Sequence, residues 1–194
     1  NFQNMEIAAE VLLRNRSNRV SFNVMPKQAA KIFFLITVTA LSFLLRFLPH
    51  SPNFTPMGAL FLFSGAYFKK NSLLVPLLVM LVSDFFIGFY DIRLMAAVYL
   101  SFSLMYLIGF LIRDNRNILK AAIGSLAGSL LFFLITNFAV WFFSSWYPKN
   151  LGGLITSYLL AMPFFRNSLA GDLFFTVLFF VCYEFLLSLK LFNN

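Results

Sequence analysis

Polar side chains that could bind a small molecule lie within or beside long apolar runs: Asn53, Thr55, Asp84, Asn137, Trp141 and Asp172. Amide and hydroxyl groups donate and accept hydrogen bonds, carboxylates accept them from amines or hydroxyls, and an indole ring stacks on a flat ligand. We therefore predict that these residues line a ligand-binding cavity. The alternative is structural: Asp84 and Asp172 would satisfy loop amides or pair with Arg46 or Arg166, and so stabilise the fold.

Residues 51–58 interrupt two apolar runs with a polar segment that contains Pro52 and Pro56. Each proline fixes its own φ and disfavours the helical region for the residue before it, so this backbone must be extended or turned. Non-helical backbone is tolerated at membrane depth only where it is buried in protein or faces a water-filled cavity. The segment is therefore either the wall of a binding cavity or an ordinary connecting loop beside the headgroups.

Catalytic and metal chemistry lack their usual residues. His50 is the only histidine and Cys182 the only cysteine, so no zinc-binding cluster is expected. No Gly-x-Ser-x-Gly nucleophile elbow and no phosphate-binding loop occur. We expect no enzymatic activity, no metal and no cofactor, and uphill transport would need a partner protein or an ion gradient.

The composition is that of an integral membrane protein. Of 194 residues, 60% are hydrophobic and 11% are charged, whereas about a quarter are charged in soluble domains. The formal charge of +8 is carried by Lys and Arg at the ends of apolar runs, without the basic stripe and interleaved aromatics of a nucleic-acid site. We expect membrane lipid, and no nucleic acid, as a partner.

The apolar runs predict an all-α bundle of six transmembrane helices over residues 32–48, 57–68, 73–89, 94–112, 118–146 and 169–189. Residues 1–31 form a basic arm, residues 32–190 the transmembrane domain and residues 191–194 a short tail. Residues 151–165 contain two glycines and a proline, and we expect them to lie along the membrane surface over the mouth of the bundle.

Several side chains have a simpler structural interpretation. Arg46, near the end of the first run, is expected to reach the interface rather than a ligand. Asp172 would be stabilised by the N-terminus of the last helix, and Glu184 would reach the opposite interface or pair with Lys190. The pair Gly124 and Gly128 predicts close helix packing within the bundle rather than a subunit interface.

The distribution of Lys and Arg orients the bundle. The arm, the even-numbered connections and the C-terminal end carry most of these residues, and the opposite side has only Arg46, Arg93, Lys149 and Arg166. Because positive charge is enriched in cytoplasmic loops, we predict that both termini are cytoplasmic. The polar residues of the predicted cavity then face outward.

A group of short motifs carries a resemblance to a known kind of protein: residues 52–60 (PNFTPMGAL), 83–84 (SD), 136–141 (TNFAVW), 147–148 (YP) and 163–172 (PFFRNSLAGD). Together they resemble an uncharacterised family of bacterial putative transport proteins, itself similar to the substrate-binding S components of energy-coupling factor transporters. The resemblance covers about residues 32–190.

This resemblance implies a multi-pass protein of the bacterial inner (plasma) membrane that captures a vitamin or similar micronutrient from outside. It also implies association with a transmembrane coupling subunit and ATPases. The alternative function is a non-catalytic accessory or scaffold subunit of a larger membrane complex, which would use its Phe-rich and small-residue faces as protein contacts.

Overall fold

The computed structural model describes residues 25–49, 51–68, 70–188 and 192–193. Residues 1–24 of the predicted arm, and residues 191 and 194 of the predicted tail, lie outside these ranges. The elements are β1 (Met25–Pro26), α2 (Lys27–Leu45), α3 (Met57–Tyr67), η2 (Lys70–Leu73), α4 (Leu74–Ile87), α5 (Ile92–Leu111), η3 (Arg113–Asn115), α6 (Ile118–Phe143), α7 (Leu151–Ser188) and β2 (Phe192–Asn193). The first helix therefore begins within the predicted arm, at Lys27.

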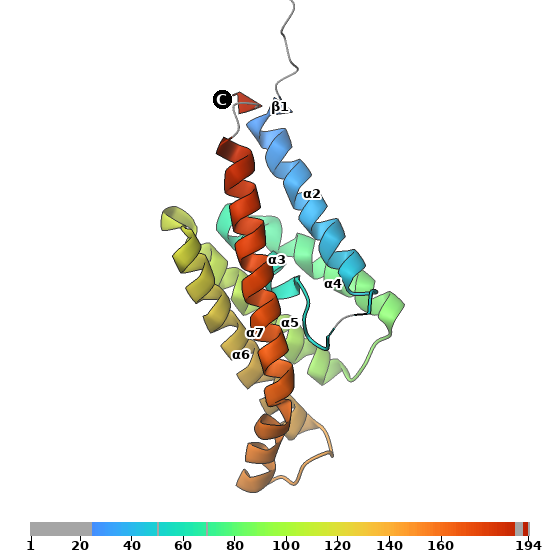
Figure 1. Cartoon of the computed structure of the whole chain (residues 1–194). Helices are drawn as coiled ribbons and strands as arrows, with labels where there is room; N and C mark the ends of the chain where they lie inside the picture. The colour runs from blue at the N-terminus through green and yellow to red at the C-terminus, as the bar shows by residue number, and fades with distance from the viewer. Residues whose placement is uncertain (1–24, 50, 69, 189–191, 194) are drawn as a thin grey trace, which may run out of the picture.

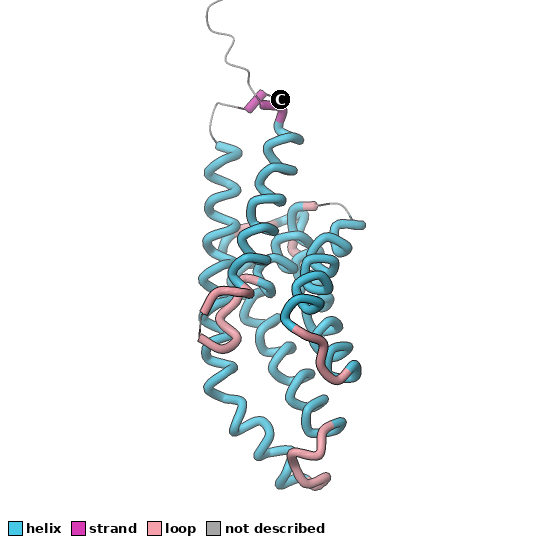
Figure 2. Tube along the Cα trace, turned by 90° about the vertical axis from the view of Figure 1, so that its right-hand side faces the viewer, coloured by secondary structure: helices cyan, strands magenta, loops and turns pink. Residues whose placement is uncertain are grey.

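The α-helices of the described chain alternate in direction and pack side by side (Figures 1 and 2). The two-residue strands β1 and β2 pair in parallel, with Met25 opposite Phe192 and Pro26 opposite Asn193. Both ends of the described chain therefore lie at the same end of the molecule. This agrees with termini that share one side of a membrane, while the identity of that side stays a prediction.

Helix α3 is the centre of the bundle, and all of its residues except Tyr67 are buried. A helix that is apolar on every face is stable only when other helices surround it. Glycines let it approach α5 closely: a Cβ added at Gly65 would lie 2.1 Å from the carbonyl oxygen of Tyr106, and one at Gly109 would lie 2.0 Å from that of Leu62. Helices α3 and α5 therefore pack in close contact through these two glycines.

Helix α6 also packs through small residues. A Cβ at Gly128 would lie 2.8 Å from the side chain of Met105, and one at Gly124 would lie 3.0 Å from that of Ile108, both on α5. Gly124 and Gly128 are buried within the bundle. The prediction that this glycine pair makes an internal packing contact is confirmed.

The predicted break before the last helix is wrong. Residues 151–165 do not lie apart along a surface but form the first part of α7, which continues for 38 residues with Pro163 inside it. An interior proline removes one helical hydrogen bond, and membrane helices tolerate this because neighbouring groups can satisfy the freed carbonyl. The α6–α7 hairpin extends to the end of the molecule opposite β1 and β2 (Figures 1 and 2).

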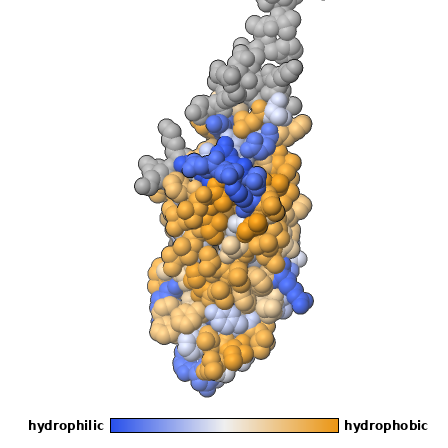
Figure 3. Space-filling model, turned by 90° about the vertical axis from the view of Figure 1, so that its left-hand side faces the viewer, coloured by the Kyte–Doolittle hydropathy of each residue, from blue (hydrophilic) through white to orange (hydrophobic). Residues whose placement is uncertain are grey.

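The surface of the molecule is suited to lipid. Helices α5, α6 and α7 are long and apolar enough to cross a membrane. The apolar parts of α2, α3 and α4 within the described residues are shorter than a full crossing needs. Large apolar side chains are exposed along every helix except α3, and Figure 3 shows an apolar surface between hydrophilic residues gathered toward its two ends. The chain is therefore a helical, membrane-embedded protein, and the count of six spans stays a prediction.

Candidate functional site

A cavity of about 220 Å³ lies where the connection after α2 meets the other helices. Charged and polar side chains share its wall with apolar ones: Arg46, Asn53, Thr55, Met57, Met80, Tyr90, Val98, Phe102, Phe132, Ser168 and Asp172. Three of the residues predicted from the sequence, Asn53, Thr55 and Asp172, are among them. Because α3 to α7 and two connections all contribute, the cavity exists only in the assembled bundle.

The loop at residues 51–56 forms a turn that closes one side of the cavity. The amide of Phe54 donates to the carbonyl of Ser51 at 3.0 Å, and Asn53 between them has φ of 64°. Proline at the second position and a left-handed asparagine at the third are typical of a type II turn. Of the two predicted conformations, extended or turned, residues 51–54 adopt the turned one.

Contacts with α7 hold this turn in place. The side-chain amide of Asn167 donates to the carbonyl of Pro52 at 3.0 Å, and the ring of Phe54 packs against those of Phe174 and Phe175. A Cβ at Gly171 would lie 3.2 Å from the backbone of the turn, so the turn packs closely against this part of α7. The turn is therefore a fixed wall of the cavity.

Arg46 forms an ion pair with Asp84, as the structural alternative for Asp84 predicted. Its Nη2 donates to Oδ1 of Asp84 on α4, and the Tyr99 hydroxyl donates to Oδ2 of the same carboxylate at 2.8 Å. The side chains of Arg46 and Asp84 are 17% and 3% exposed. Asp84 does not line the cavity itself; it holds the guanidinium that does.

The other arm of the Arg46 guanidinium has no assigned partner. Its Nη1 atom is buried and makes no hydrogen bond within the described part of the chain. A buried donor without a partner loses the free energy of its hydration, so a site of this kind favours a ligand or water that supplies an acceptor. Arg46 was missed as a site residue, although its position beside the polar break was the available signal.

Asp172 lies in the middle of α7, not in its first turn, so the expected stabilisation by a helix N-terminus is wrong. The Ser129 hydroxyl on α6 donates to its Oδ2 at 2.7 Å. Gly58 at the start of α3 faces the carboxyl group, since a Cβ there would lie 2.2 Å from Oδ1. Arg166 makes no ion pair with Asp172 among the residues that the structure describes.

Asn137 lines a smaller cavity of about 100 Å³. This cavity shares Asn53, Phe132 and Ser168 with the larger one, so the two adjoin. The Asn137 side-chain amide donates to the carbonyl of Phe133 one turn earlier at 2.8 Å, which satisfies one of its donors within its own helix. Asn137 therefore lines the smaller, adjoining cavity and not the larger one.

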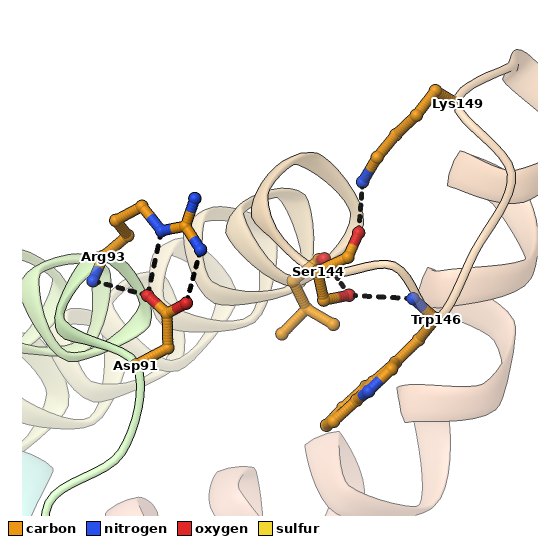
Figure 4. A network of polar contacts seen from close by, with 6 residues as sticks. Asp91, Arg93, Ser144, Trp146 and Lys149 are labelled. Carbon is orange, nitrogen blue, oxygen red and sulfur yellow. Dashed lines mark hydrogen bonds and ion pairs between the residues drawn. The ribbon is translucent and has the colours of Figure 1, made fainter.

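Trp141 lies outside both cavity linings, at the α6–α7 turn. Its indole N–H donates to the carbonyl of Pro148 at 2.9 Å, and Lys149 lies over its ring and donates to backbone carbonyls of Trp141 and Ser144. Figure 4 shows Lys149 reaching Ser144, with Trp146 on the other side. The indole of Trp141 therefore stabilises the α6–α7 turn.

Two further acids, Asp91 and Glu184, lie outside the lining of the cavity. Asp91, before α5, forms a two-point pair with Arg93 (Figure 4), and these hydrogen bonds lower the pKa of its carboxyl to about 2. Glu184 accepts from the Tyr67 hydroxyl at 2.6 Å and lies 3.9 Å from Nε of Arg116, while its suggested partner Lys190 is outside the described residues. These contacts stabilise the ends of helices.

The site offers hydrogen bonding and charge rather than an evident reaction. Its polar groups are one guanidinium, one carboxyl, amide and hydroxyl groups, and no group of three His, Cys, Asp or Glu side chains suited to a metal occurs in the described ranges. Tyr90, Tyr99, Ser129 and Ser168 were not predicted, because a single hydroxyl group in or beside an apolar run does not by itself indicate a binding site.

Comparison with known proteins gives one family. A family of unknown function (DUF6580) matches residues 26–192, which is most of the chain and all of the bundle. Comparisons with curated proteins and with solved structures give no match.

Proposed function

The chain belongs to the DUF6580 family, whose function is unknown, and we propose that it is a membrane substrate-binding subunit similar to the S components of energy-coupling factor transporters. It captures a vitamin or similar small micronutrient at the bacterial inner membrane. The observation that supports this most is the polar cavity walled by Arg46, Thr55, Ser168 and Asp172 inside a bundle with a lipid-suited surface.

The cavity has the character of a binding site. Ionisable side chains within a membrane bundle are costly, and they usually mark substrate or ion pathways. Here Arg46, directly after α2, and Asp172 of α7 line one space together with apolar rings and thioethers. Ligand pockets commonly combine a mostly apolar wall with a few well-placed polar groups.

Under this proposal the bundle has six spans and both termini are cytoplasmic, so the wall at residues 51–56 faces outward. Transport would be energised by another polypeptide, because the sequence contains no phosphate-binding loop. The expected partners are a transmembrane coupling subunit and ATPases. Accumulation against a gradient in liposomes that contain only this chain, without an ion gradient, would contradict this part of the proposal.

Mass spectrometry of small molecules extracted from the purified protein tests the function. We expect a stoichiometric polar compound in the wild-type protein and in a Trp141→Phe control, whose ring lies outside both cavities. Ser168→Leu, which places a larger apolar side chain in the cavity wall, should lose the compound while keeping its helical circular dichroism. Equal retention in Ser168→Leu, or no compound in the wild type, would contradict the proposal.

The alternative is an accessory subunit of a larger membrane complex, and one feature favours it. An entirely apolar groove of about 660 Å³ runs between α2 and α4, lined by residues that include Ile36, Phe43, Leu78 and Val82. A helix of a partner protein would fit such a surface. Co-purification from native membranes separates the two functions: ATPases indicate uptake, and a fixed place in an unrelated assembly without a bound small molecule indicates a scaffold.

A further inference from the structure

The charges around the cavity do not balance. Arg46 and Asp84 form a neutral pair through Nη2 and Oδ1. Asp172 adds a second carboxyl group, whose assigned partner is the neutral hydroxyl of Ser129. Among the described residues that line the cavity, Arg46 is the only Lys or Arg, so when Asp172 is ionised the site has one negative charge in excess.

A buried excess carboxylate is stable only when a cation or a proton compensates its charge. Ionised acids inside membrane bundles generally pair with another charge, because burial without compensation is expensive. Asp172 is 7% exposed, and it lies on the cavity wall with Ser168 one turn away on the same helix. A cationic group in the cavity can therefore reach a carboxylate that the protein itself leaves without a positive partner.

Arg46 indicates a second feature of the ligand, which is a hydrogen-bond acceptor. Its Nη2 is engaged by Asp84, and its buried Nη1 has no partner within the described part of the chain. Because Asp84 already compensates the charge of this guanidinium, the free N–H needs an acceptor but not a second anion. An uncharged carbonyl, hydroxyl or ring nitrogen satisfies it without adding to the negative excess.

The size of the cavity limits the ligand. The cavity has a volume of about 220 Å³, and the adjoining space adds about 100 Å³. Side chains such as Met57, Met80, Val98 and Phe102 share its wall with the polar groups. We therefore expect a small ligand that has apolar parts beside its polar groups.

We infer that the ligand is a small organic monocation, with an ammonium or protonated ring nitrogen that pairs with Asp172 and an uncharged acceptor that binds the guanidinium of Arg46. This inference rests on the proposed function and specifies its substrate class. It distinguishes the site from one for an anion, a zwitterion or an inorganic cation.

Matched short-chain compounds test the inference on the purified full-length protein, with thermal stabilisation in detergent as the readout. Four series share the same chain lengths: ω-amino amides, plain alkylamines, ω-amino acids and neutral alkanamides. We expect the amino amides to bind about ten-fold more tightly than the alkylamines, the value of one hydrogen bond to a charged group. The amino acids and alkanamides should bind more weakly than the amino amides.

Variants assign each end of the ligand. Asp172→Asn should remove the preference for cations, and the exposed control Asp91→Asn should keep it. Arg46→Lys keeps a positive charge for Asp84 but removes the forked guanidinium, so it should reduce the advantage of amino amides over alkylamines without removing the preference for cations. This second variant keeps the test decisive if Asp172→Asn does not fold.

The outcomes separate the inference from the proposed function. Tighter binding of alkanamides or amino acids would overturn the monocation assignment while leaving a small-molecule site. Stabilisation by Na⁺ over K⁺ without any selectivity among the amines would assign Asp172 to an inorganic cation and also overturn it. No stabilisation by any compound or ion would contradict the binding function itself.

Discussion

Asp84→Asn should be among the most destabilising conservative substitutions in the bundle. The carboxylate is 3% exposed and accepts hydrogen bonds from Arg46 and from the hydroxyl of Tyr99. The amide keeps its shape but leaves the largely buried guanidinium without an anion. Removing one partner of a buried ion pair costs about 3–5 kcal/mol, and we expect a value near the lower end because Arg46 is still 17% exposed.

A double-mutant cycle identifies the cause. Arg46→Met alone should also destabilise the protein, because it leaves the Asp84 carboxylate buried without its cation. The combination Asp84→Asn with Arg46→Met should be less destabilised than either single variant, since no unpaired charge remains. The control Asp91→Asn breaks an exposed pair with Arg93 and should change stability little.

Unfolding in mixed dodecyl maltoside and SDS micelles, followed by circular dichroism, measures each free energy of unfolding. Two results would refute the reasoning. One is a decrease in the free energy of unfolding below about 1 kcal/mol for Asp84→Asn, which would mean that the Arg46–Asp84 pair contributes no more than an exposed ion pair. The other is a double variant whose loss equals the sum of the two single losses, which would mean that Arg46 and Asp84 do not interact.

Further predictions concern packing, the turn and topology. Gly65→Ala should destabilise the bundle by about 1–3 kcal/mol in the same assay, because the added Cβ meets the backbone of α5. Gly152→Ala, at an exposed position, should be close to neutral, and equal effects of the two substitutions would contradict the packing. Asn53→Ala should lower the unfolding free energy by about 1–2 kcal/mol, since φ is 64°, and Asn53→Gly should lower it less; the reverse order would rule out a conformational cause. In a background without the native cysteine, an impermeant thiol reagent added to intact cells should label Asn150→Cys and not Asn115→Cys, and the opposite pattern would reverse the predicted orientation.

Features that depend on composition or local stereochemistry could be predicted from the sequence. Apolar runs with few charges identify a membrane-embedded helical protein whatever the tertiary arrangement, because lipid and protein interiors both accept such surfaces. The turned backbone before α3 follows from Pro52 and Pro56, whose rings restrict φ in any context. The close packing at Gly124 and Gly128 follows from the absence of a side chain.

Which polar groups meet was decided only by the tertiary structure. Arg46 and Asp84 are 38 positions apart and Ser129 and Asp172 are 43 apart, so their contacts depend on how each helix is rotated and on the register between antiparallel neighbours. The continuity of α7 through Pro163 likewise depends on packing that supports the helix, and it places Asp172 in the middle of a helix rather than at an expected helix start. Trp141 turned away from that cavity because the carbonyl of Pro148, seven residues later, accepts its N–H, a contact that exists only once the α6–α7 turn has closed.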